Sequence, residues 1–155
     1  MFEVGQKIMY PMQGDGVIEG IEEQNETMYY NIRIPSANIK IRIPAEKAMQ
    51  IGMRKPAHKA ELEEVINRVG DLVVQSSGNW NIRYKENIER LRTGQLEEVT
   101  KVVKVLREQQ KIKKLSLAEN QLFHMAKQIL IGEIVVSCEI NEEKAMEQLA
   151  NWLKS

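Results

Sequence analysis

The run YNIRIPSANIKIRI, residues 30–43, indicates β-structure in the first half of the chain. In residues 30–34 and again in 39–43, apolar and polar side chains alternate with a period of two, which is the pattern of half-buried strands. Between them, residues 35–38 have the length and composition of a hairpin loop. The run therefore predicts a β-hairpin.

The register of this hairpin follows from the requirement that its apolar side chains share one face. The predicted pairs are Tyr30 with Ile43, Ile32 with Ile41, and Ile34 with Ile39. On the opposite face Arg33 then stands across from Lys40, with Arg42 close by, and like charges directly opposed repel each other. This basic face is either a solvated surface or a contact site for an acidic partner.

Two more short strands are predicted upstream, at residues 7–10 and 17–21, with Pro11, Gly14 and Gly16 forming the turn between them. Short strands at this spacing predict a small, strongly bent antiparallel barrel. Such a unit has exposed edges, where a strand of another protein can be added.

From residue 61 the hydrophobic period becomes helical, and five helices are expected. Gly94 is expected to end the second helix, Ser116 and Glu119 to form a capping box at the fourth, and Asn141 to cap the fifth. The apolar positions that mark the five helices are Leu62, Val65, Ile66 and Val69; Trp80, Tyr84, Ile88 and Leu91; Leu96, Val99, Val103 and Leu106; Leu122, Met125, Ile129 and Ile134; and Ala145, Leu149 and Trp152.

The predicted fold class is therefore α+β with two domains. A small antiparallel β-barrel is expected in residues 1–55, a junction in 56–60, and an all-α bundle of about five helices in 61–155.

The charge of the chain is zero overall but unevenly distributed. Residues 83–114 contain ten basic and five acidic side chains, so the positive charge is concentrated just after Trp80. Zero net charge argues against strong indiscriminate attraction to nucleic acid. The single cysteine, Cys138, cannot form an internal disulfide and is read as a small buried apolar residue, so a reducing cytoplasm is the expected compartment.

Residues suited to catalysis or metal binding are sparse. His58 falls in the junction and His124 inside a helix, with no second ligand at metal spacing. Gly14-Asp15-Gly16 is followed by a predicted strand, unlike a phosphate-binding loop, which is followed by a helix. We expect neither enzymatic activity, nor a cofactor, nor a metal.

The segment around Trp80 has two interpretations. Spacings of four, four and three link Trp80 to Tyr84, Ile88 and Leu91 on one helical face, which favours a core position. However, Trp80 lies at the predicted helix start, where few neighbours cover a large ring and free backbone N–H groups favour a phosphate. The basic residues that follow off the apolar face, Arg83, Lys85, Arg90 and Arg92, complete a plausible minor-groove wedge.

Several segments in combination resemble the CarD/CdnL family of bacterial transcription regulators, over nearly the whole chain. They are Phe2-Glu3-Val4-Gly5, Tyr10-Pro11, Arg42-Ile43-Pro44-Ala45-Glu46, Asn79-Trp80-Asn81-Ile82-Arg83-Tyr84-Lys85-Glu86-Asn87, Leu115-Ser116 and Ala126-Lys127-Gln128-Ile129-Leu130.

The resemblance implies a Tudor-like (SH3-like) barrel, related to the polymerase-binding module of the transcription-repair coupling factor, that docks on the β subunit of RNA polymerase by strand addition. Arg42 would lie at this contact, and we assign its neighbours Lys40 and Arg33 to the same surface. The helical half would bind promoter DNA at the upstream edge of the opening bubble. There Trp80 would wedge into the minor groove while Arg83 and Lys85 hold phosphates.

Three positions depart from the family pattern. Gln13 stands where a histidine is usual, Gln24 where an arginine can occur at the polymerase contact, and Ile82 where a basic residue is usual. Without a charge at position 82, one phosphate contact is missing and the salt dependence of DNA binding becomes flatter. We therefore expect weak DNA affinity that is effective only when polymerase holds the protein nearby.

The function predicted from the sequence is that of a non-catalytic regulator that bridges RNA polymerase and promoter DNA and stabilises the open complex. The expected protein is a cytoplasmic, nucleoid-associated monomer without a membrane or small-molecule partner. The alternative is a protein-only adaptor, with a polymerase-binding barrel and a helical half that recruits another protein. An RNA- or ribosome-binding barrel is a weaker third alternative, which only the small β unit suggests and the helical half does not support.

Overall fold

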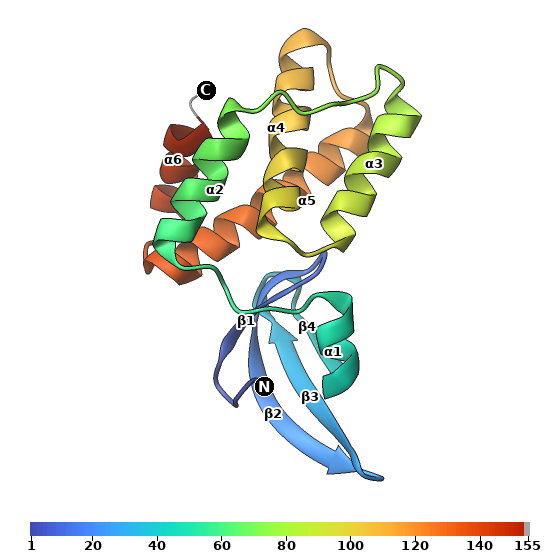
Figure 1. Cartoon of the computed structure of the whole chain (residues 1–155), viewed down its shortest axis with the longest axis vertical. Coiled ribbons are helices and arrows are strands. Elements are labelled where there is room, and N and C mark those ends of the chain that lie inside the picture. The colour runs from blue at the N-terminus through green and yellow to red at the C-terminus, as the bar shows by residue number, and fades with distance from the viewer. Residues whose placement is uncertain (154–155) are drawn as a thin grey trace.

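A sheet at one end and a bundle of helices at the other make up the computed structural model, which describes residues 1–153 (Figure 1). The last two residues of the predicted bundle, 154–155, lie outside the described residues. The elements are β1 (Lys7–Tyr10), β2 (Gly14–Gln24), β3 (Thr27–Ile34), a 3-10 turn (Pro35–Ala37), β4 (Ile39–Pro44), α1 (Ala45–Ile51), α2 (Lys59–Asp71), α3 (Trp80–Arg92), α4 (Leu96–Ile112), α5 (Leu117–Cys138) and α6 (Glu142–Leu153).

The sheet is antiparallel with the strand order β1-β2-β3-β4. The β3–β4 register confirms the predicted hairpin, because all three expected apolar pairs are present and Arg33 stands opposite Lys40. At the end of the loop, Asn38 adopts the left-handed conformation with φ of 52°. A register shift between Ile18 and Gly20 bends the long strand β2. This bent sheet is the expected Tudor-like unit.

Helix α1 was not predicted from the sequence. It follows β4 directly and ends at Gly52, whose φ of 98° is accessible mainly to glycine. Only Ala48 of this short helix is buried. With seven residues and one buried position, α1 presents too little hydrophobic periodicity to be recognised. We refer to β1–β4 with α1 as the β half, and to α2–α6 as the helical half.

The five helices of the helical half confirm the predicted bundle. They share one apolar core, to which Leu62, Leu91, Leu106, Leu130 and Trp152 all contribute. As predicted, Gly94 follows α3 with a positive φ of 69°, and the Asn141 side chain accepts a hydrogen bond from the backbone N–H of Lys144. Cys138 is half-buried against this core, and its burial raises the pKa of the thiol. Across residues 1–153, the helices lack the combination of length and apolarity that a bilayer crossing requires.

The two halves are joined by a buried polar contact. Glu133 of α5 is almost fully buried and accepts hydrogen bonds from both terminal guanidinium nitrogens of Arg54, at 2.6 and 2.8 Å, and from the backbone N–H of Ala57. Arg54 also donates to the carbonyl of Gly94, between α3 and α4. The segment between the sheet and α2 is therefore fixed to two separate parts of the helical half, α5 and the connection between α3 and α4.

The end of α2 is capped by a buried lysine. Lys104 of α4 donates from its ammonium group to the carbonyls of Val69, Gly70 and Leu72. Its charge therefore serves the carbonyl end of α2, where a cation is favourable. This contact fixes the start of residues 72–79, the loop that leads to Trp80.

Candidate nucleic-acid interface

Trp80 is the first residue of α3 and leaves 46% of its surface exposed. Neither core of the described residues includes it, although Tyr84, Ile88 and Leu91, which follow on the same face, pack into or against the helical core. The apolar stripe of α3 therefore begins outside the core and enters it one turn later. Of the two sequence interpretations, the structure favours the ring that faces outward.

Asn79 caps the start of α3. Its side-chain oxygen accepts hydrogen bonds from the backbone N–H groups of Asn81 at 3.0 Å and Ile82 at 3.3 Å. From the sequence, the backbone N–H groups of this first turn were expected to be free to bind a phosphate. Two of them are already satisfied by Asn79, so a phosphate near Trp80 must be held mainly by side chains.

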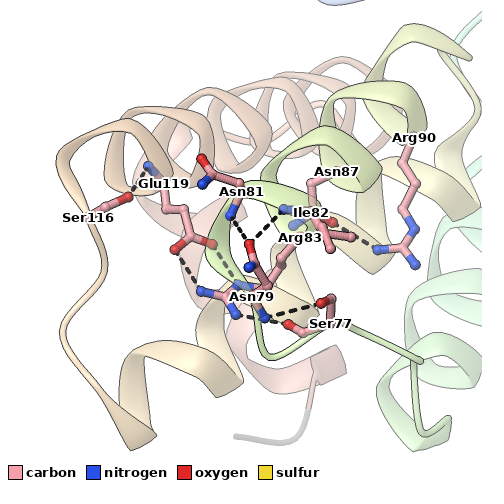
Figure 2. A network of polar contacts seen from close by, with 9 residues as sticks. All are labelled: Ser77, Asn79, Asn81, Ile82, Arg83, Asn87, Arg90, Ser116 and Glu119. Carbon is pink, nitrogen blue, oxygen red and sulfur yellow. Dashed lines mark hydrogen bonds and ion pairs between the residues drawn. The ribbon is translucent and has the colours of Figure 1, made fainter.

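Arg83 occupies a different place from the one predicted. It was expected on the solvent side of α3, holding a phosphate, but only 5% of its surface is exposed. Its Nε and one terminal nitrogen donate to the two carboxylate oxygens of Glu119, at 2.7 and 2.8 Å (Figure 2). The hydrogen bonds that Arg83 donates to the Glu119 carboxylate raise the pKa of the guanidinium further above its ordinary value.

The Arg83–Glu119 pair also fixes the loop before Trp80. The second terminal nitrogen of Arg83 donates to the carbonyl of Ser77 at 2.9 Å, and the Ser77 hydroxyl accepts from the backbone N–H of Asn79 (Figure 2). Thus Glu119, on the first turn of α5, holds the segment that presents Trp80 through a single guanidinium group.

Glu119 does not complete the predicted capping box. The Ser116 hydroxyl accepts a hydrogen bond from the Glu119 backbone N–H at 3.2 Å, as expected. The Glu119 carboxylate, however, points to Arg83 instead of back to Ser116 (Figure 2). This role of Glu119 was not predicted from the sequence. The available signal was a glutamate in line with the buried Leu122 and Ala126 of α5.

The remaining predicted cations of α3 differ in how free they are. Lys85 is exposed, and within residues 1–153 no carboxylate pairs with it. Arg90 is half-buried and donates to the Asn87 side chain and to the Gln75 carbonyl. Arg92 is exposed and forms an ion pair with Glu89 at 2.9 Å. Lys85 is therefore the one of these three best placed to meet a phosphate.

The predicted basic face of the sheet is present but partly neutralised. Glu19 of β2 lies 3.2 Å from the Arg33 guanidinium and 3.9 Å from the Lys40 ammonium group. This carboxylate relieves the repulsion between the two cations. The sequence of β3 and β4 alone showed no counter-charge for them. All three residues are exposed, so the ion pairs compete with solvent and contribute little to stability.

Arg42 is held in a defined orientation on the same face. Its guanidinium stacks on the Tyr29 ring, 4.0 Å from the ring centre, and donates to the side-chain oxygen of Gln24 at 2.6 Å. Glu22 lies 3.8 Å away. Arg42 is part of β4, one of the two edge strands of the sheet, and the outer edge of β4 pairs with no described strand. A basic, aromatic-backed surface therefore borders an edge that can accept another strand.

Comparison with known proteins covers both surfaces. The family described as CarD, C-terminal domain, matches residues 64–150, and the domain described as CarD-like/TRCF RID matches residues 2–57. A Bacillus subtilis protein named "Putative transcription factor YdeB" is 31% identical over 148 residues. The aligned region covers 93% of this chain and 97% of that protein.

Proposed function

The chain belongs to the CarD family, as the resemblance in its sequence predicted, and on this premise we propose that it regulates transcription by binding RNA polymerase and promoter DNA together. Residues 1–55 form the polymerase-binding unit, 56–60 the junction, and 61–155 the DNA-binding unit. The protein acts without catalysis, as a non-covalent bridge between the enzyme and the promoter.

The β half docks on the polymerase β subunit by adding a strand to the free edge of β4. Arg42 meets an acidic group at this contact, with Lys40 and Arg33 beside it. The stacking of Arg42 on Tyr29 supports this assignment, because a pre-oriented guanidinium loses less conformational freedom when it binds.

The helical half places Trp80 in the minor groove at the upstream edge of the bubble. A ring that enters a partly unstacked base step binds open DNA better than closed DNA, and therefore shifts the equilibrium toward the open complex. Lys85 contacts a phosphate, and Arg90 and Arg92 add weaker attraction. Arg83 contributes indirectly, by fixing the loop that presents the ring.

The observation that carries this proposal is a half-exposed tryptophan on a buried polar scaffold. An aromatic ring at a helix start would ordinarily be mobile, but residues 77–79 are tied to α5 through Arg83 and Glu119. Orientation fixed before binding lowers the entropy cost of insertion into DNA.

The direct test is Trp80→Ala in the full-length protein, with a bacterial RNA polymerase and a promoter whose open complex is short-lived. We expect a severalfold shorter open-complex lifetime and unchanged capture of polymerase. Met146→Ala is a matched control, because Met146 is also apolar, 53% exposed, and on α6. An unchanged lifetime in the Trp80 variant would refute the wedge.

The second candidate function is the protein-only adaptor. It is favoured by the exposed, uncharged Ile82 and by the burial of Arg83, which together leave fewer cations near Trp80 than expected. The discriminating measurement is binding to forked and to fully paired promoter DNA in the presence of polymerase, over a range of salt concentrations. A wedge prefers the fork, whereas an adaptor binds both equally.

A further inference from the structure

The end of the helical half that lies away from the sheet carries an unusual set of exposed apolar side chains. Figure 1 shows that the loop before α3 and the connection from α4 to α5 both lie at this end. Twelve large apolar residues are exposed among the described residues. Six of them belong to this end: Leu72, Val73, Trp80, Ile82, Ile112 and Leu117.

The same end carries cations that no carboxylate neutralises. Residues 111–114, Lys-Ile-Lys-Lys, are all exposed, and we call them the KIKK segment. Within residues 1–153, none of its three lysines has an ion-pair partner. The one acidic residue just upstream, Glu108, lies 3.8 Å from the Lys104 ammonium group. The charge of the KIKK segment is therefore available to an external anion.

The KIKK segment is tied to the Trp80 loop through α5. Leu115 is buried and Ser116 caps α5. Glu119 accepts a hydrogen bond from Arg83, which lies one helical turn after Trp80. Even fully extended, the chain from Lys114 to Glu119 spans at most about 18 Å. A duplex of that length carries roughly ten phosphates. One bound duplex can therefore reach both Trp80 and the KIKK segment.

We propose that the KIKK segment is a second DNA-binding element, which holds the phosphate backbone beside the site where Trp80 enters the minor groove. This inference rests on the proposed function and extends it. Lys113 and Lys114 supply phosphate contacts that this chain lacks at Ile82, and Lys85 lies on the α3 side of the ring. Ile112 and Leu117 pack against the sugars between the phosphates.

DNA fits this surface better than an acidic protein does. Salt-sensitive phosphate binding needs exposed, unpaired lysines rather than a fixed geometry, because lysine acts as a point charge on a flexible stem. The lysines of the KIKK segment lie at the same end of the helical half as Trp80, so DNA that binds Trp80 also passes these lysines.

The test is the double variant Lys113→Gln/Lys114→Gln in the full-length protein. Binding to forked promoter DNA with RNA polymerase is measured as a function of salt. The slope of log affinity against log salt should become shallower by about 1.8, and affinity at low salt should fall by about tenfold. The matched control is Lys59→Gln/Lys144→Gln, which removes two exposed lysines from the end of the helical half nearer the sheet.

Four outcomes overturn the inference. If the KIKK variant keeps the wild-type slope while Trp80→Ala weakens fork binding, the wedge stands and the KIKK segment is only solvated. If the variant instead loses capture of polymerase without DNA, its partner is an acidic protein surface. If Trp80→Ala and the KIKK variant both behave as wild type, the proposed function fails as well. If the salt slope changes as much in the Lys59→Gln/Lys144→Gln control as in the KIKK variant, the effect comes from net charge alone and not from a contact at the KIKK segment.

Discussion

Arg83 and Glu119 form a two-pronged ion pair, at 2.7 and 2.8 Å, that joins the first turn of α3 to the first turn of α5. Both side chains are almost fully buried. Buried ion pairs often contribute little net stability, because the desolvation of two charges offsets their attraction. What this pair provides is a fixed position for the Ser77 carbonyl, and through it for Trp80.

Removing Glu119 should destabilise the helical half strongly. Glu119→Ala leaves the Arg83 guanidinium buried without a counter-charge, and we expect a loss of about 3–5 kcal/mol in the free energy of unfolding. Urea denaturation followed by circular dichroism measures this loss. A change below about 1 kcal/mol would mean that Arg83 swings out to solvent and that the pair does not hold the loop.

The double variant Arg83→Met/Glu119→Leu separates stability from positioning. Two apolar side chains of similar size should recover much of the stability lost in Glu119→Ala. The Ser77 carbonyl nevertheless loses its donor, so open-complex lifetime should stay short although the fold is restored. If lifetime recovers together with stability, the pair serves the fold alone.

Truncation of the two tryptophans should lower the free energy of unfolding by very different amounts. Trp152 is 5% exposed in the helical core, and Trp152→Ala should cost about 3–5 kcal/mol. Trp80 is 46% exposed, and Trp80→Ala should cost less than about 1 kcal/mol. In a Trp152→Phe background, Trp80 is the only fluorophore of its kind, and acrylamide should quench it readily until DNA is added. Equal destabilisation by the two alanine variants would place Trp80 in the core.

The joint between the halves depends on Glu133. Glu133→Gln removes the charge that two guanidinium nitrogens of Arg54 share, while the amide can still accept one hydrogen bond. We expect a loss of about 1–3 kcal/mol and independent unfolding of the two halves. Amide hydrogen exchange measures this uncoupling, because the protection of the sheet amides and that of the bundle amides should differ in the variant. Arg68→Gln, which removes solvent-accessible ion pairs with Glu64 and Glu97 inside the helical half, is the control and should leave the halves coupled.

Patterns that repeat along the chain were predictable. Alternation in residues 30–43 gave the register of the β3–β4 hairpin, since only one register places all its isoleucines on one face. The apolar repeats after residue 61 gave five helices, and Ser116, Asn141 and Gly94 marked their ends. Each of these features is determined by neighbours in sequence, so one chain is enough to reveal it.

Contacts between distant segments were not predictable in the same way. Arg83 looks like a surface cation by its spacing, and only the approach of α5, 36 residues later, buries it against Glu119. Glu133 and Arg54 are 79 residues apart. A hint existed in α5, where Glu119 and Glu133 both lie on the buried face. A buried carboxylate requires a partner, but the sequence does not identify it.

The polymerase contact is tested by reversing one charge. Arg42→Glu places a carboxylate beside Glu22 on the sheet face, where an acidic partner would now be repelled. Capture of polymerase should fall at least about tenfold, and the free energy of unfolding should change by less than about 1 kcal/mol, because the residue is exposed. Lys144→Glu, at an exposed site on α6, should capture polymerase like the wild type. Full capture by the Arg42 variant would remove this residue from the interface.

Restoring a cation at position 82 should strengthen DNA binding. Ile82 is 53% exposed, and its place three residues before Lys85 sets the two side chains side by side on α3. Ile82→Arg should make the salt dependence of fork binding steeper by about 0.9 and lengthen the open-complex lifetime, because one more phosphate is neutralised. The substitution should change the free energy of unfolding little, since the Ile82 side chain is not part of either core.

Met146→Arg is the control that separates a local phosphate contact from a general gain of charge. Met146 is also 53% exposed, but it lies on α6 and belongs to neither proposed DNA-binding surface. Both variants raise the net charge by one, so non-specific attraction should increase equally in the two. Only Ile82→Arg should steepen the slope on forked DNA. Equal slopes in the two variants would show that position 82 faces away from the phosphates, and the orientation proposed for α3 on DNA would then be wrong.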